Sequence, residues 1–401
     1  MRTFTFKSLF LTVLFVLLGS LAIQAADDGL ITKQITLKLD EAGTLPDRIA
    51  VSRKNLITNL KIVGKINGTD LKFIREMAGC DYYLNKTDGK LSILDLSEAK
   101  IVAGGDAYVH IETYNTSNDY YTSNDKLGNY AFKGCSGLTS MIIPSGVTAI
   151  GKEAFYGCSG LTSLTIPSSV TEIGELAFEG CSGLTSMTIP SSVTSIGWGA
   201  FAECSGLTSL TIPSSVTSIR RYAFAGCSGL TSLTIPSGVT SIGNYAFADC
   251  SGLTSLTLPS SVTSIGEYAF ENCSGLTSLT IPSSVTSIGN SAFRGCSGLT
   301  SIYVYPEKLP ELGTDIFNRC DAKNCTVYVP KGTIDDYKLS KFGYFEKIVE
   351  FDASGIDKVT TSTNAKEVSR YSANGQRLSA PAKGLNIVKY SDGSVKKVVV
   401  Q

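Results

Sequence analysis

Hydrophobic and polar positions alternate along residues 138–298 in a pattern that returns every 23 residues. One copy, residues 161–183, reads LTSLTIPSSVTEIGELAFEGCSG. Leu161, Leu164 and Ile166 alternate with hydroxyl side chains, which predicts a short, half-buried strand. Pro167 lacks the N–H that a strand ladder needs, so we expect the strand to end there. A fixed period of this length predicts a solenoid in which each repeat packs only on its neighbours.

The second half of each repeat is expected to complete one turn of the coil. Val170 and Ile173 predict a second short extended segment, and Gly174 is expected to relax the following bend. Phe178 and Cys181 are expected to point inward from a tight turn. Each inward residue would then stack on its equivalent 23 positions away. The predicted fold is a mainly β repeat solenoid with irregular N- and C-terminal caps.

This pattern resembles the BspA-like class of bacterial leucine-rich repeats, whose signature follows the predicted strand. It stands as IGKEAFYGCSGL at residues 150–161 and as IGNYAFADCSGL at residues 242–253. The resemblance implies a right-handed leucine-rich repeat coil. It also implies a surface-displayed or secreted protein that binds extracellular proteins of a host matrix or of other cells. It implies no enzyme and does not name a ligand.

The first 26 residues have the features of a secretory signal peptide. Arg2 and Lys7 supply positive charge, Leu9–Leu18 is an apolar run, and small residues near Ala25 are suited to cleavage. The run is too short to cross a bilayer. We therefore expect an exported protein, either secreted or associated with the cell surface or outer membrane. We expect no transmembrane segment in the mature chain.

Residues 27–127 are expected to form an N-terminal cap with irregular repeats, because a terminal repeat must present one face to water. Strands are predicted within residues 31–39, 55–66 and 90–102. A short helix is predicted over residues 70–78, with Asp70 or Thr69 near its start.

Residues 128–298 are the regular repeats, and residues 299–350 are expected to form a C-terminal capping repeat. A strand is predicted at residues 325–333 and a helix at residues 334–341. Residues 351–401 read as a linker and a small β tail, with Asn374-Gly375 and Asp392-Gly393 as hairpin turn signals. This tail resembles the C-terminal sorting modules of type IX secretion. The alternative is a small β appendage without a sorting role.

Two positions after each Ile-Gly pair vary between repeats and supply candidate binding residues. Trp198 is the single tryptophan of the chain, and Arg220 replaces the usual glycine of its repeat. Trp, Tyr and Arg are the residues that dominate binding energy at interfaces. The alternative is that the rings shelter ladder edges and that Trp198 and Arg221 form a surface cation–π pair without a ligand. The candidates in the array are Trp198, Arg220, Arg221, Tyr222, Tyr245 and Tyr268.

A second candidate region, residues 104–128, departs from the period and is predicted to be a loop that leaves the coil. Its tyrosines lie among small polar residues, a composition suited to contact surfaces. The alternative is that the rings close the N-terminal edge of the coil. The four tyrosines are Tyr108, Tyr114, Tyr120 and Tyr121.

Composition and motifs argue against nucleic-acid binding, catalysis and metal binding. Thirty-five basic and thirty-five acidic residues cancel, so no global field would attract nucleic acid. The chain has one histidine, His110, which any Ser–His–Asp arrangement would have to use. The GCSG segments suggest a nucleophile only superficially, because they recur with the repeats. We expect no cofactor and no metal site.

The eleven cysteines of an expected exported protein suggest disulfides. Stacked, inward-pointing cysteines would have parallel side chains, which favours buried thiols that pack as small apolar groups. Cys320 and Cys325 are the one pair suspected of bridging. The predicted ladder is Cys135, Cys158, Cys181, Cys204, Cys227, Cys250, Cys273 and Cys296.

The function predicted from the sequence is therefore binding or adhesion at the cell surface through the solenoid. A carbohydrate-binding accessory protein is the alternative, suggested by the hydroxyl-rich strand face and the aromatic rows. A secreted hydrolase is a remote alternative that depends on His110.

Overall fold

The computed structural model describes residues 29–352, 367–372, 377–378, 384–390 and 395–400. The chain divides after Glu350 into two units. The predicted signal peptide, residues 1–26, lies outside the described residues.

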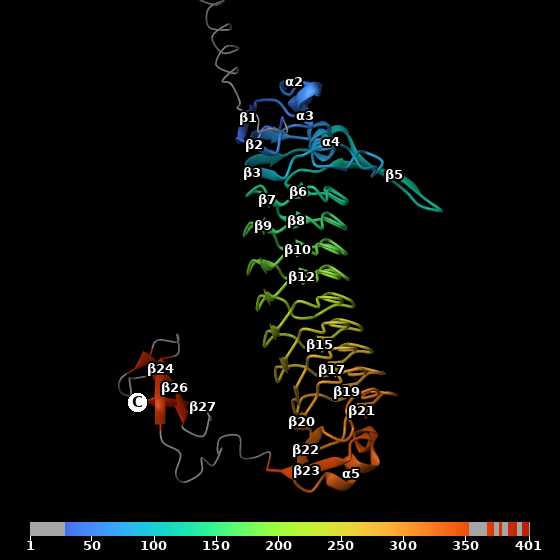
Figure 1. Cartoon of the computed structure of the whole chain (residues 1–401), viewed down its shortest axis with the longest axis vertical. Coiled ribbons are helices and arrows are strands. Elements are labelled where there is room, and N and C mark those ends of the chain that lie inside the picture. The colour runs from blue at the N-terminus through green and yellow to red at the C-terminus, as the bar shows by residue number, and fades with distance from the viewer. Residues whose placement is uncertain (1–28, 353–366, 373–376, 379–383, 391–394, 401) are drawn as a thin grey trace, which may run out of the picture. The chain divides into compact units, whose positions relative to one another are not determined.

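The first unit is a coil of parallel strands whose first ladder lies on the strand predicted at the head of each repeat (Figure 1). Equivalent residues pair across repeats, as Ser209 does with Ser232. One sheet of this ladder contains β1 (Ile35–Leu39), β2 (Asn59–Ile66), β3 (Ile93–Ile101), β7 (Ser140–Ile142) and β9 (Ser163–Thr165). The next contains β11 (Ser186–Thr188), β13 (Ser209–Thr211), β14 (Ser232–Thr234), β16 (Ser255–Thr257), β18 (Ser278–Ile281), β20 (Ser301–Val304), β22 (Thr326–Pro330) and β23 (Lys347–Phe351).

A second ladder lies on the second extended segment of each repeat and is interrupted once. Between its two sheets, Ile219 forms only a single bridge, to Ile242. The first sheet contains β6 (Lys126–Leu127), β8 (Ala149–Ile150), β10 (Glu172–Ile173) and β12 (Ser195–Ile196), and the second contains β15 (Ser241–Ile242), β17 (Ser264–Ile265), β19 (Ser287–Ile288) and β21 (Glu311–Leu312).

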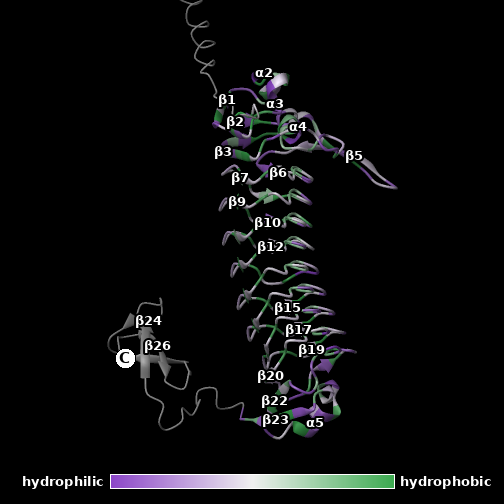
Figure 2. Cartoon of the chain, viewed as in Figure 1, coloured by the Kyte–Doolittle hydropathy of each residue, from purple (hydrophilic) through white to green (hydrophobic). Residues whose placement is uncertain are grey.

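The core is a set of parallel ladders, as the period predicts. Leu161, Val170, Ile173, Phe178 and Cys181 are fully buried, and Figure 2 shows hydrophobic and hydrophilic residues alternating along the turns. The phenylalanine rings from residue 132 to residue 317 stack with centroids 5.1–5.9 Å apart. Burying one such side chain stabilises the fold by roughly 1.5–3 kcal/mol, and no repeat can achieve this without its neighbours.

The hydroxyl face of the coil has a structural role. Thr162 Oγ1 donates to the carbonyl of Thr139 at 3.0 Å, and Thr208 Oγ1 donates to that of Thr185 at 3.1 Å. The second ladder repeats this contact, as from Thr171 to the carbonyl of Thr148. These hydroxyl protons are therefore used within the coil.

The N-terminal cap continues the coil, because β1, β2 and β3 are the first strands of its first sheet. The helices of the cap are α2 (Leu45–Arg48), α3 (Val51–Lys54) and α4 (Gly68–Met77). Helix α4 begins earlier than predicted, because Asn67 caps it and accepts from the N–H of Thr69 at 3.0 Å. Asp70 completes the capping box by accepting from the N–H of Asn67 at 2.9 Å.

The predicted loop at residues 104–128 is largely an antiparallel hairpin, which corrects the sequence interpretation. Strands β4 (Gly104–Glu112) and β5 (Ser117–Thr122) pair with each other and project from the N-terminal end of the coil (Figure 1). A two-stranded pairing satisfies the backbone groups of a segment that has left the coil.

The C-terminal cap contains α5 (Ile334–Leu339) and the 3₁₀ helix η1 (Lys341–Tyr344), close to the predicted helix. Buried Tyr337 donates its hydroxyl to the carbonyl of Pro306 at 2.7 Å, which closes the end of the coil.

The second unit contains an antiparallel sheet in the order β25-β24-β26-β27. Its strands are β24 (Glu367–Ser372), β25 (Arg377–Leu378), β26 (Gly384–Tyr390) and β27 (Val395–Val400). The Asn374-Gly375 and Asp392-Gly393 pairs lie outside the described residues. A sorting role for this unit stays a prediction.

Candidate binding surface on the repeat array

Glycine after the second strand is required by close packing between repeats. A Cβ added to Gly197, Gly243 or Gly266 would lie 2.5–2.7 Å from backbone atoms of the preceding repeat. None of these glycines has a positive φ. Gly174 was expected to relax a bend, but the structure gives a different reason for glycine at this position. A Cβ on Gly174 would lie 2.6 Å from the backbone of Gly151, so only glycine allows the neighbouring turn to approach this closely.

Arg220 occupies this position in the repeat of residues 207–229, and the second ladder is interrupted there. In the neighbouring repeats, the N–H groups of Gly197 and Gly243 donate to an isoleucine carbonyl of the preceding repeat at 2.8 Å. Within the described residues, Arg220 makes no such bond to Ile196. A side chain with a Cβ cannot approach the preceding backbone as glycine does, so the two repeats separate locally.

Arg220 and Arg221 also place two positive charges next to each other in the chain. In the described part of the chain, no hydrogen bond or ion pair of the exposed Arg220 side chain is present, and Arg221 has no carboxylate partner. Arg221 donates to the hydroxyl of Tyr222 at 3.3 Å, and its guanidinium lies 4.8 Å from that ring centroid. By contrast, Arg294 in a regular repeat pairs with Glu271 at 2.8 Å.

Aromatic side chains extend from these arginines along the coil. Tyr245 stacks on Tyr222 at 4.7 Å and on Tyr268 at 4.6 Å, so the tyrosines cover each other's faces and present edges and hydroxyls. Trp198, 37% exposed, meets the Tyr222 ring edge-on at 6.0 Å. Five of the six array residues predicted from the sequence thus lie in contact along one surface, and the sixth, Arg220, directly precedes Arg221 in the chain. We call it the aromatic–arginine patch: Trp198, Arg220, Arg221, Tyr222, Tyr245 and Tyr268.

The patch residues also carry backbone strain. Tyr222, Tyr245 and Tyr268 have φ values of 55–57°, in the left-handed region that favours glycine. A non-glycine residue there costs roughly 1–2 kcal/mol. Bonds between repeats hold the conformation, such as that from the N–H of Tyr245 to the carbonyl of Glu267 at 2.8 Å.

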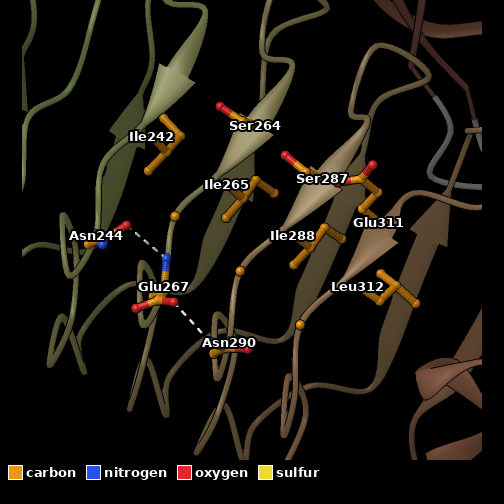
Figure 3. Close-up of a pocket in the computed structure, with 13 residues that line it drawn as sticks. Ile242, Asn244, Ser264, Ile265, Glu267, Ser287, Ile288, Asn290, Glu311 and Leu312 are labelled. Atoms are coloured by element: carbon orange, nitrogen blue, oxygen red, sulfur yellow. Dashed lines mark hydrogen bonds between the residues drawn. The ribbon is translucent and has the colours of Figure 1, made fainter.

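A hollow lies along the second ladder, and two of its lining residues, Asn244 and Glu267, directly precede Tyr245 and Tyr268 of the patch in the chain (Figure 3). Asn244, one repeat after Arg221, accepts from the N–H of Glu267 at 3.0 Å, and Asn290 donates to the Glu267 carboxylate at 2.8 Å. The variable row after Ile-Gly contains these three residues, but sequence reasoning did not predict the hollow. Its lining residues include Ile242, Asn244, Ile265, Glu267, Ile288, Asn290, Glu311 and Leu312.

The hairpin tyrosines do not form one site. Tyr108 is 1% exposed and donates its hydroxyl to the carbonyl of Asn129 at 2.7 Å, so its prediction as a contact residue is wrong. Tyr120 is half-buried and meets the Tyr130 ring edge-on, with ring centroids 4.7 Å apart. Tyr114, at the tip, and Tyr121 are exposed and stay candidates.

His110 lies on the hairpin in a polar and aromatic cluster. Its Nδ1 is 2.7 Å from Asp119 Oδ1, and its Nε2 is 3.1 Å from Ser117 Oγ. Tyr82 also donates to Asp119, and these hydrogen bonds hold the pKa of the Asp119 carboxyl below its usual range. The hydrogen bond between Tyr82 and Asp119 raises the pKa of Tyr82 to about 12. The order of contacts is that of a Ser–His–Asp triad, although the side chains lie on an exposed hairpin.

The cysteine ladder is buried, and its thiols also donate hydrogen bonds. Cys181 Sγ donates to the carbonyl of Phe155 at 3.2 Å, and this contact recurs between repeats at 3.1–3.3 Å. Burial raises the pKa of Cys181 to about 12. The suspected bridge between Cys320 and Cys325 is absent, because both are free and Cys320 donates to Phe293 as a further rung.

The described residues contain no group of three or more His, Cys, Asp or Glu side chains placed to hold a metal ion. No helix among them is both long and apolar enough to span a bilayer.

The fold is thus a parallel β-solenoid with an exposed aromatic and cationic patch. A family profile described as "BspA type Leucine rich repeat region" matches residues 108–231 and 217–342 with six copies, more than half of the chain. The chain belongs to this family of leucine-rich repeat proteins.

Several solved structures of leucine-rich repeat proteins are similar to the chain. A leucine-rich repeat protein from Bacteroides ovatus is 24% identical, with 61% of this chain and 90% of that one covered and a TM-score of 0.27. The Treponema protein TpLRR (T. pallidum) is 27% identical over 54% of this chain and 82% of that one, with a TM-score of 0.31. A leucine-rich cell surface protein from Faecalibacterium prausnitzii is 22% identical over 79% and 87%, with a TM-score of 0.36. Among curated proteins, no match is found.

Proposed function

We propose that this protein is an exported, surface-associated binding protein, without catalytic activity, that holds an extracellular protein partner through the aromatic–arginine patch. The observation that carries this proposal is Arg220. It interrupts the second ladder, and its side chain forms no stabilising hydrogen bond or ion pair within the described residues. A residue that weakens the local structure and forms no compensating contact is typical of a functional position.

The chemistry of the patch supports a partner segment that carries carboxylates. Two adjacent guanidinium groups can each form bidentate bonds with carboxylates, and neighbouring aromatic edges add buried contact area. Acidic Glu267, which lines the hollow and directly precedes Tyr268 in the chain, would orient the partner by repelling its carboxylates. Because the arginines are exposed, capture should weaken as salt is raised.

The test is capture of purified extracellular-matrix proteins, such as fibronectin, fibrinogen, laminin and collagen, by the immobilised mature protein. The double variant Arg220→Gly with Arg221→Gln should lose about tenfold or more in affinity, because interface arginines are frequent hot spots. Lys152→Gln is the matched control, since Lys152 is the equivalent of Arg221 in another repeat and lies 3.8 Å from Glu175. Equal capture by the double variant and the parent would move the site elsewhere, first to Tyr114 and Tyr121.

Glycan binding stays the alternative, and a glycan array run beside the protein panel separates the two. The threonine hydroxyls of the coil donate to carbonyls of the preceding repeat, so that face offers a glycan mainly acceptors. Fractionation of native cells tests the localisation. The mature protein is expected on the outer surface.

The contacts of His110 favour one further candidate, a hydrolase that uses Ser117. A fluorophosphonate probe labels a serine whose hydroxyl is activated by a neighbouring base. Under our proposal Ser117 stays unlabelled in the folded protein. Labelling that Ser117→Ala and Asp119→Asn both abolish would establish the hydrolase instead.

A further inference from the structure

Arg75 is a fully buried cation at the junction of the N-terminal cap and the first regular repeat. Its guanidinium donates to the carbonyls of Tyr130 and Ala131 at 3.0 Å, and to those of Asp81 at 3.3 Å and Lys133 at 3.2 Å. No ion pair to a carboxylate is present for it in the described residues. A buried charge without a counter-ion is strongly unfavourable, so this position favours a nearby anion.

The group placed to supply that anion is the thiol of Cys80. Its Sγ lies 3.5 Å from Arg75 Nη2, and the residue is 2% exposed. The Cys135 thiol and the charge of Arg75 lower the pKa of Cys80 to about 7. Burial and the charge of Asp81 raise the pKa, but their effect is smaller. A large share of Cys80 is therefore thiolate at neutral pH, and thiolate is the nucleophilic form.

Cys135 differs from every later member of the cysteine ladder. Each cysteine from Cys158 to Cys296 donates to the phenylalanine carbonyl 26 residues earlier. Cys135 makes no such bond among the described residues, because the hairpin of β4 and β5 interrupts the coil before it. The Cys80 thiol packs against this part of the coil, because its Sγ would lie 3.1 Å from a Cβ added to Gly134, the residue before Cys135. Arg75, Cys80 and the turn before Cys135 therefore form one cluster.

We propose that Cys80 and Cys135 form a reactive thiol pair that closes to a reversible disulfide, with Cys80 as the attacking thiolate and Cys135 as the resolving thiol. This inference is independent of the binding function proposed for the patch. It concerns the junction of the cap with the array, where an oxidised pair would tie the turn after α4 to the first regular repeat.

The oxidant is a low-molecular-weight disulfide, RSSR. The Cys80 thiolate attacks one sulfur of RSSR, the S–S bond breaks, and RS⁻ leaves and takes up a proton. Cys135 then loses its proton to solvent and attacks the Cys80 sulfur of the mixed disulfide, which releases a second RS⁻. Two protein thiols are oxidised and RSSR is reduced to two RSH. Cys80 directly precedes the turn at residues 81–85, which has exposed residues, so local opening of that turn admits the reagent.

The array supplies a matched control pair. Cys273 and Cys296 are neighbouring members of the ladder, and no cation is among the groups that act on Cys273. The nearby Cys296 thiol and burial keep the pKa of Cys273 well above the usual thiol value. Arg75 lies beside Cys80 but not beside Cys273. A comparison of the two pairs therefore shows whether reactivity comes from activation of the thiolate by Arg75 or only from the nearness of two thiols.

The experiment treats the reduced, folded, full-length mature protein with glutathione disulfide at pH 7.5, followed by N-ethylmaleimide and peptide mapping without reduction. We expect a peptide that links Cys80 to Cys135, with Cys273 and Cys296 unmodified. Cys135→Ser should stop at a glutathione adduct on Cys80, and Cys80→Ser should give neither product. Alkylation of Cys80 in the parent should be at least tenfold faster than that of Cys273 and should rise through pH about 7.

Oxidation should also raise the melting temperature of the first unit, and dithiothreitol should reverse the rise, because the bond closes a long loop between cap and array. The proposal is overturned if Cys80 and Cys273 react equally in the folded protein, if the linked peptide joins Cys273 to Cys296, or if Cys80 stays unmodified. Should either serine variant fail to fold, the peptide map of the parent alone decides.

Discussion

The repeat of residues 207–229 and the repeat of residues 253–275 share almost the same sequence but differ in how they join the coil. In the later repeat, Gly266 donates to Ile242 at 2.8 Å and β17 pairs on both sides. In the earlier repeat, Arg220 stands at the glycine position and the second ladder is interrupted.

The interruption does not reach the interior. Phe224 stacks on Phe201 at 5.6 Å and on Phe247 at 5.4 Å, and Cys227 still donates to the carbonyl of Phe201 at 3.2 Å. A stacked coil therefore tolerates the loss of a few surface hydrogen bonds as long as its apolar ladders continue. This tolerance is what allows one repeat to carry an unusual surface.

The largest expected effect concerns the shared interior. Phe270→Ala and Phe224→Ala should each lower the free energy of unfolding by about 3–5 kcal/mol, because each leaves a cavity between two stacked rings. Urea denaturation followed by circular dichroism measures both. A much smaller loss for Phe224→Ala would show that the interior is loosened at the irregular repeat, contrary to the comparison.

A smaller effect should come from crowding a regular repeat. Gly266→Ala should cost about 1–3 kcal/mol, since its Cβ would lie 2.6 Å from Asn244 Oδ1 and 2.7 Å from the Asn244 nitrogen. Gly157→Ala is the control. Gly157 has a φ of 70° but no atom within 4 Å of an added Cβ, so only backbone strain of about 1 kcal/mol applies. Equal losses in urea denaturation would argue against close packing as the reason for glycine.

The smallest and most informative change restores the glycine. Arg220→Gly should raise the free energy of unfolding by about 1 kcal/mol, because up to two backbone hydrogen bonds of roughly 0.5–1.5 kcal/mol each can form, less the entropy lost by glycine. Thermal melting measures this gain. The same variant should bind matrix proteins more weakly. Lower stability, or unchanged stability with unchanged capture, would remove the reason to regard Arg220 as functional.

Much of this architecture could be predicted from repetition alone. Leu161, Phe178 and Cys181 were correctly predicted to point inward, because the same residue type recurs at each of these positions from repeat to repeat. The array candidates from Trp198 to Tyr268 were found because they vary where the other positions do not. The hairpin was harder: its pattern occurs once, and the sequence does not show that Tyr108 turns into the core while Tyr114 turns outward.

By itself, the sequence determined the coil, its period, its apolar ladders and the positions where surface chemistry varies, because each follows from a pattern repeated along one axis. Only the tertiary structure decided which groups lost or gained a partner. Arg220 breaks a ladder because of backbone atoms in the preceding repeat, and Cys80 lies beside Arg75 and the turn before Cys135 because the cap packs on the first regular repeat. Both depend on contacts between segments far apart in the chain, which no local pattern encodes.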